Sequence, residues 1–194
     1  MRPRFTVLAA LATGFGLGLA GCGQQLAVTS HAGQEGLATV SASQADPVSA
    51  WAEGYCGAAG GFVRTLATLP SVDPSTPQQA SRTSSELMAS VVEGLNRTLA
   101  ALENLGPSPV AGGDASRTAA VAQLDSIRVR ADDVRHRLDS STDAEATKTA
   151  LRDARTSLDE LDRLDLLRGL NDVPQLASAS SRIQGCQELV KQPR

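Results

Sequence analysis

Apolar residues recur at steps of three and four along most of this chain, a spacing that places them on one face of an α-helix. The pattern predicts four long helices and a shorter one from 174 to about 189. No segment alternates apolar and polar positions as a strand would, so the expected fold class is all-α. The apolar stripes consist of Trp51, Tyr55, Phe62, Leu66 and Leu69; Leu87, Val91, Leu95, Leu99 and Leu102; Val121, Leu124, Ile127, Ala131, Val134 and Leu138; and Leu151, Ala154, Leu158, Leu161 and Leu164 or Leu167.

Helix start and stop signals separate these stripes. Asp46 lies directly before a proline, a favourable start for the first helix. Thr142 precedes Glu145 by three positions, which forms a capping box, so the fourth helix is expected to begin there. Gly106 and the stretch 169–174 are expected to end the second and fourth helices.

The short connections between the long helices favour antiparallel neighbours. The sequence therefore predicts an up-down four-helix bundle over residues 46–194, with the shorter fifth helix joined to the first. A looser array is the alternative, in which the first helix is broken at Gly57, Gly60 and Gly61. Glycines lower helix stability but permit close packing, so these three are also candidates for a close helix contact.

The first 21 residues have the layout of an export signal. Arg2 and Arg4 precede a 16-residue apolar stretch, 5–20, and small residues stand before Cys22. A transmembrane helix needs roughly 20 apolar residues, and the glycines of this stretch weaken a helix further. Residues 1–21 are therefore expected to be a signal peptide rather than a membrane span.

The end of this signal, Leu19-Ala20-Gly21-Cys22, resembles the lipobox of bacterial lipoproteins. In that family a diacylglycerol is attached to the cysteine sulfur and the preceding peptide is removed. The resemblance implies lipidation of Cys22 and attachment of the mature protein to the extracytoplasmic face of the cell membrane. Each buried methylene of the acyl chains would add about 0.8 kcal/mol to this attachment. An ordinary secretory signal with a chance cysteine is the alternative.

Residues 22–45 are rich in Gly, Ser, Ala, Gln and Thr and show no apolar periodicity. This composition predicts a flexible tether with an r.m.s. span of roughly 25 to 30 Å. The expected organisation is thus a signal peptide over 1–21, a lipidated tether over 22–45 and a helical domain over 46–194.

Two cysteines remain once Cys22 is assigned to the lipid. Export would place Cys56 and Cys186 in an oxidising compartment, where a disulfide persists. Such a bond would join the first helix to the last, close a loop of 130 residues, and stabilise the fold by about 4 to 5 kcal/mol in the chain-entropy model. The alternative is two unpaired buried thiols, and the absence of a Cys-x-x-Cys motif disfavours a redox role.

The charge pattern disfavours several classes of partner. The formal charge of −3 includes Arg2 and Arg4 of the signal, and no basic cluster is interleaved with aromatics, so no nucleic-acid partner is expected. His136 lies in a charged run without a second ligand at metal-binding spacing. The acidic residues near the end of the fourth helix do not fit a calcium loop. No metal and no cofactor are expected.

Trp51, Tyr55 and Phe62 are the three aromatic residues after the signal, and all lie on one face of the first helix. They are expected chiefly to fill the core. Lining an apolar ligand pocket between helices is the alternative role for them.

The lipobox, the tether, the Trp51-to-Cys56 pattern and the distal Cys186 together resemble the small exported lipoproteins of actinobacteria. Because no catalytic motif accompanies these features, the expected function is a non-enzymatic binding or accessory module that contacts another envelope protein or the cell wall. A carrier of an apolar ligand or lipid is the second hypothesis, and an enzyme is the third.

Overall fold

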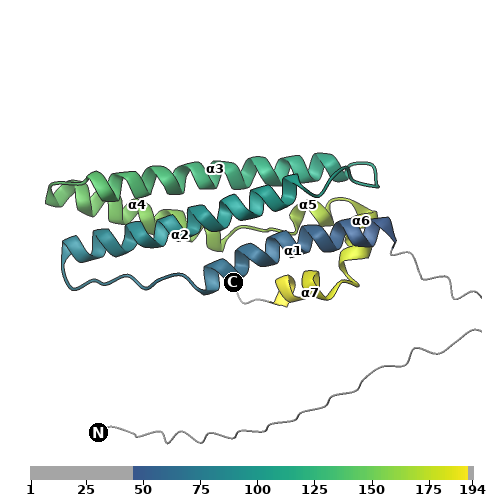
Figure 1. Ribbon diagram of the computed structural model, residues 1–194, viewed down its shortest axis with the longest axis horizontal. Helices are drawn as coiled ribbons and strands as arrows, with labels where there is room; N and C mark the ends of the chain where they lie inside the picture. The colour runs from purple at the N-terminus through teal and green to yellow at the C-terminus, as the bar shows by residue number, and fades with distance from the viewer. Residues whose placement is uncertain (1–45, 192–194) are drawn as a thin grey trace, which may run out of the picture. The chain divides into compact units, whose positions relative to one another are not determined.

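The computed structural model describes residues 46–191, and within that range every regular element is a helix, which confirms the all-α class. The signal peptide, Cys22 and the tether lie outside the described residues. Three short helices follow four long ones (Figure 1). The elements are α1 (Pro47–Ala67), α2 (Pro77–Glu103), α3 (Gly113–Ser140), α4 (Ala144–Asp162), α5 (Arg168–Asn171), α6 (Pro174–Ser180) and α7 (Gln184–Lys191).

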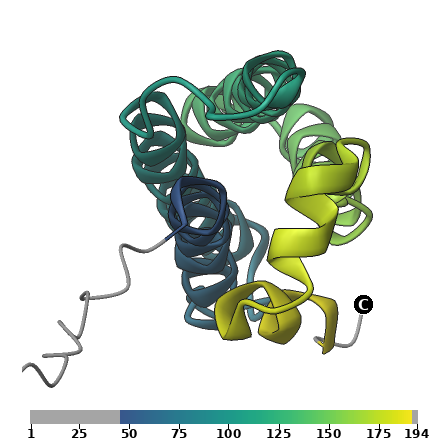
Figure 2. The same ribbon diagram turned by 90° about the vertical axis from the view of Figure 1, so that its right-hand side faces the viewer.

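The long helices and the short C-terminal helices pack against different sides of α1. α2 packs against both α1 and α3, and α4 packs against α3 and α2. The remaining side of α1 is covered by α6 and α7, which Figure 2 shows as the yellow segment beside the dark-blue helix. The C-terminal helices therefore enclose α1, while α5 connects α3 to α6.

The aromatic face of α1 is part of one continuous core. Trp51, Tyr55 and Phe62 are 6%, 2% and 1% exposed, which confirms that this face is buried. Asp46 caps the start of α1, because its carboxylate accepts hydrogen bonds from the backbone amides of Val48 and Ser49. The largest side chains fully buried with this face are Met88, Leu95, Leu102, Leu170, Leu176 and Val91.

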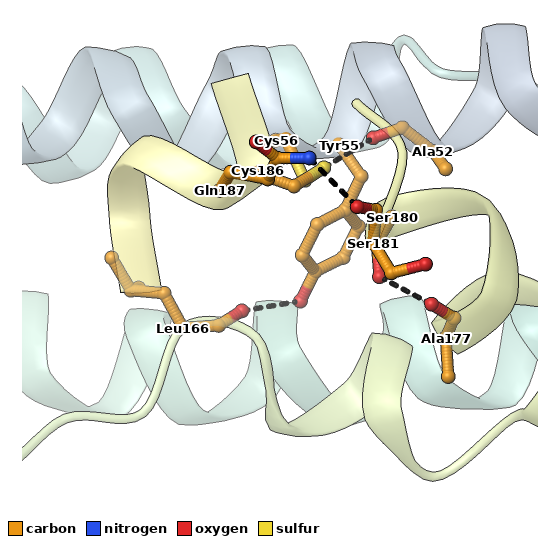
Figure 3. Close-up of a disulfide and its surroundings, with 9 residues drawn as sticks. All are labelled: Ala52, Tyr55, Cys56, Leu166, Ala177, Ser180, Ser181, Cys186 and Gln187. Carbon is orange, nitrogen blue, oxygen red and sulfur yellow. Dashed lines mark hydrogen bonds between the residues drawn. A yellow bond between two sulfur atoms is a disulfide. The ribbon is translucent and has the colours of Figure 1, made fainter. Parts of the chain in front are cut away.

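A disulfide joins Cys56 of α1 to Cys186 of α7, as the cysteine count predicts (Figure 3). Both residues are almost completely buried, at 1% and 2% exposure. The Gln187 side chain donates to the carbonyl of Ser181 at 2.8 Å and so ties α7 to the turn before it. This turn holds both short helices on the same side of α1.

Three predicted boundaries are wrong. Asp143, not Thr142, caps α4, since its carboxylate accepts hydrogen bonds from the backbone amides of Glu145 and Ala146 at 3.0 and 2.8 Å. α4 ends at Asp162, so Leu164 lies on a connection and not on the helical stripe. The single helix expected after 174 is divided by a turn at 181–183, which allows both α6 and α7 to contact α1.

The glycines of α1 have a different role from the one expected. α1 continues unbroken through Gly57, Gly60 and Gly61, so the alternative with a broken first helix is wrong. Apart from its chain neighbours and the backbone of its own helix, nothing lies within 4 Å of a Cβ added at Gly57. A close approach between α1 and α2 is made by Gly94 of α2, where an added Cβ would lie 2.7 Å from Cγ2 of Thr65 in α1. None of the helices described within 46–191 combines the length and apolarity needed to cross a membrane.

Two glycine substitutions are expected to change stability in opposite directions. Gly57→Ala should stabilise the domain by about 0.5 to 1 kcal/mol, because alanine favours the helix and the site is open. Gly94→Ala should destabilise it by about 1 to 3 kcal/mol, because the methyl group would separate α1 from α2. Urea unfolding measures both, and equal effects of the two changes would contradict the assigned contact.

Candidate functional site

The connection between α4 and α5, residues 163–167, crosses the face of α1; we call it the strap. The Tyr55 hydroxyl donates to the Leu166 carbonyl at 3.2 Å, and Figure 3 shows the ring reaching from α1 to this segment. Leu164 and Leu166 are half-buried, whereas Leu167 is buried. The strap is thus packed on apolar side chains although it has no regular secondary structure.

One pocket, the Tyr55 pocket, lies beside the strap and has a volume of about 430 Å³. Its interior is largely apolar, and its exposed edge carries Gln123, Asp165, Arg168 and Asp172. A molecule with an apolar body and a polar end therefore matches the distribution of side chains. The other lining residues are Tyr55 and Ala59 of α1, Thr98 and Leu102 of α2, Ala115, Ser116, Ala119, Ala120 and Leu124 of α3, and Leu164, Leu166 and Gly169.

Small side chains on α3 explain why this space is open. The first half of α3 presents Ala115, Ala119 and Ala120 toward the pocket. Further along, the same helix buries larger residues such as Ile127 and Leu138 in the core. The change from alanine to longer apolar side chains leaves the N-terminal part of α3 with too little volume to fill the space next to α1.

A second pocket, the Phe62 pocket, lies on the other side of the strap and has a volume of about 440 Å³. Phe62 and Leu66 of α1 form one wall, and Leu189 and Val190 of α7 contribute another. The side chain of Val190 is at the surface, since the residue is 73% exposed. Completion of this pocket therefore depends on the position of α7.

The electrostatic environment keeps the interior of the Tyr55 pocket uncharged. Burial, assisted by the negative charge of Asp165, raises the pKa of Tyr55 to about 12, so its hydroxyl remains a neutral donor. The Thr98 hydroxyl donates to the Gly94 carbonyl at 2.9 Å. No buried side-chain nitrogen or oxygen within 46–191 lacks a hydrogen-bond partner. The pocket can therefore take an apolar group without leaving a polar atom unpaired.

The three aromatic residues considered as ligand contacts do not line the same pocket. Tyr55 lines the first pocket and Phe62 the second. Trp51 lies among the lining residues of neither; its Nε1 donates to the Gly106 carbonyl at 3.4 Å, and its ring centroid is 5.9 Å from that of Tyr55. Trp51 therefore packs behind Tyr55.

Sequence reasoning missed the strap and the alanines of α3. The three-four spacing continues through Leu164 and Leu167, which extends the expected helix past its true end. The alanines carried little signal, because Ala115 and Ala119 lie outside the apolar stripe of the third helix and are exposed.

Of the polar groups considered in the sequence, His136 and Glu160 lie away from the two pockets, whereas Asp162 lines the Phe62 pocket and Asp165 lines both. The His136 side chain is 65% exposed and its Nε2 lies 3.6 Å from a carboxylate oxygen of Asp132. Glu160 pairs with Arg130 at 3.0 Å, also in an exposed position where ion pairs contribute little. Among the described residues, no group of three or more His, Cys, Asp or Glu side chains is arranged to hold a metal ion.

Comparison of the chain with protein-family models, with curated proteins and with solved structures gives no match.

The single tyrosine of the sequence allows a direct test of the Tyr55 environment. Its phenolate absorbance should appear with a midpoint near pH 12, well above the ordinary value of 10.0. The folded state holds this proton more tightly than the unfolded state does. Its contribution to the free energy of unfolding is therefore fully present below the ordinary pKa of 10.0 and is lost as the pH rises from 10.0 toward 12. Tyr55→Phe should remove this part of the pH dependence of urea unfolding. A midpoint near 10.0 in the folded protein would contradict the buried hydroxyl.

Proposed function

We propose that this protein is a non-enzymatic binding module of the bacterial cell envelope that holds an apolar or amphipathic small molecule in the Tyr55 pocket. The observation that carries the proposal is this pocket of about 430 Å³, with its apolar interior and polar edge. Pockets that hold small organic ligands measure roughly 300 to 1,000 Å³ and have a predominantly apolar lining. The carrier hypothesis is therefore preferred over an accessory module that acts through its outer surface alone.

The position of the pocket supports the same function. Side chains of α1, α2, α3 and the strap converge on it, and sites between helices are common in helical bundles. We take α1 to α4 as an up-down four-helix bundle, whose open flank between α1 and α4 is occupied by the strap. The ligand would enter at the exposed edge that carries Gln123 and Arg168.

The proposed location follows from the N-terminal sequence. Residues 1–21 would be removed as a signal peptide, Cys22 would carry the acyl chains, and residues 22–45 would join the membrane to the domain over 46–194. This arrangement, that of the small exported lipoproteins of actinobacteria, would hold the pocket within reach of membrane lipids. An apolar ligand would be available there at high local concentration.

A large side chain at the Tyr55 pocket should weaken ligand binding. Ala119→Trp places a large ring at this pocket, which Ala119 lines from an exposed position, whereas Ala122→Trp places the same ring on an equally exposed part of α3 that lines neither pocket. We expect the first change to weaken binding of the fluorescent fatty acid cis-parinarate at least about tenfold. The reason is that keeping part of its apolar chain out of the pocket should cost over about 1 kcal/mol of binding free energy. The second should leave binding unchanged. Equal binding by both variants, or a native mass spectrum of membrane-purified protein with a protein partner and no small molecule, would favour the accessory module instead.

The intact mass of protein purified from its own membrane tests the anchor separately. The expected chain begins at Cys22 and carries the added mass of a diacylglycerol. Cys22→Ala should remove metabolic labelling by an alkyne-bearing palmitate. Labelling that survives this change, or an unmodified chain cut at another position, would show that the lipobox assignment is wrong.

A further inference from the structure

The two pockets lie on consecutive turns of one face of α1. Tyr55 and Ala59 line the first, and Phe62 and Leu66 line the second. Seven residues separate the two aromatic rings in sequence, which corresponds to about 10 Å along the helix axis. A molecule that reached both pockets would therefore have to be elongated and lie parallel to α1.

The strap is what separates the pockets. Leu164, Asp165 and Leu166 line both of them, so the same three residues form a shared partition. Two hydrogen bonds of the strap are local, from the Leu164 amide to the Leu161 carbonyl at 3.2 Å and from the Leu167 amide to the Asp165 carboxylate at 3.1 Å. The first of these bonds can persist if Asp165 and Leu166 move.

The middle of the strap is joined to α1 by the hydrogen bond from Tyr55 to the Leu166 carbonyl. This bond is neutral and 3.2 Å long, and its acceptor belongs to a half-buried residue of irregular backbone. A neutral hydrogen bond of this kind contributes only a modest net stability. Displacement of the strap therefore requires an incoming group that offsets the loss of this bond at the buried Tyr55 hydroxyl and replaces the apolar contacts of Leu164 and Leu166.

We propose that the ligand is a single unbranched acyl or alkyl chain, which displaces the strap and occupies both pockets along α1. This inference rests on the proposed function, since it assigns a ligand class to the same site. The polar end of the chain remains at the edge formed by Gln123, Arg168 and Asp172, and the apolar end reaches Leu189 of α7. A compact ligand fits one pocket and leaves the Tyr55 hydrogen bond in place.

Photo-labelling of the full lipoprotein in its membrane tests chain length directly. Diazirine analogues of octanoate and palmitate, each reactive at the chain end, are compared, and the labelled residues are identified by peptide mass spectrometry. The octanoate analogue should label lining residues of the Tyr55 pocket only. The palmitate analogue should label Leu66 or Leu189 in the Phe62 pocket. Labelling of one pocket by both analogues would overturn the inference.

Substitution of the hydroxyl tests the role of the strap. Tyr55→Phe should raise labelling of the Phe62 pocket by the palmitate analogue about three- to tenfold at subsaturating probe, the factor expected for one neutral hydrogen bond. Labelling by the octanoate analogue, which does not cross the strap, should change less. Ser81→Ala is the matched control, because it removes another hydroxyl-to-carbonyl bond, to Leu138 at 3.0 Å, away from both pockets. A Tyr55→Phe effect of the same size on both analogues, or none on either, would overturn the inference. Absence of labelling in both pockets would instead overturn the proposed function.

Discussion

The disulfide between Cys56 and Cys186 maintains the contact between α1 and α7 on which one wall of the candidate site depends. α7 has eight residues, too few for a helix that is stable in water by itself. Cys186 is its buried residue, and Leu189 is half-buried against the core. The disulfide therefore adds a covalent constraint to a small packed contact, and both hold Leu189 and Val190 where they line the Phe62 pocket.

The same helix face supplies both the core and the site. Tyr55 and Phe62 are among the most buried side chains of the domain, yet each also borders a pocket. The reason lies in their neighbours, because leucines of α2 fill the space on one side of α1 while alanines of α3 do not fill it on the other. An apolar pocket formed in this way needs no polar residue in the interior, which is why the charged side chains lie at its edge.

Apolar spacing was sufficient to predict the four long helices, because each presents a continuous stripe to the core. It failed at Leu164, where the spacing continues but the helix does not. The end of α4 is associated with a tertiary contact, the hydrogen bond from Tyr55 to a carbonyl 111 positions later, and such a contact cannot be recognised from local spacing. Tyr55 and Phe62 could be selected by residue type, whereas the pockets depend on the shortness of side chains such as Ala119, which carries no chemical signature.

The positions of the two cysteines also affect how the domain responds to hydrolysis of its backbone. α2 to α6 lie within the covalent ring of 130 residues that the disulfide closes. The exposed connections at 68–76 and 141–143 are part of this ring. A protease that cuts either connection leaves two pieces still joined through Cys56 and Cys186, with their helices packed together. One cleavage would thus nick the domain without releasing any fragment.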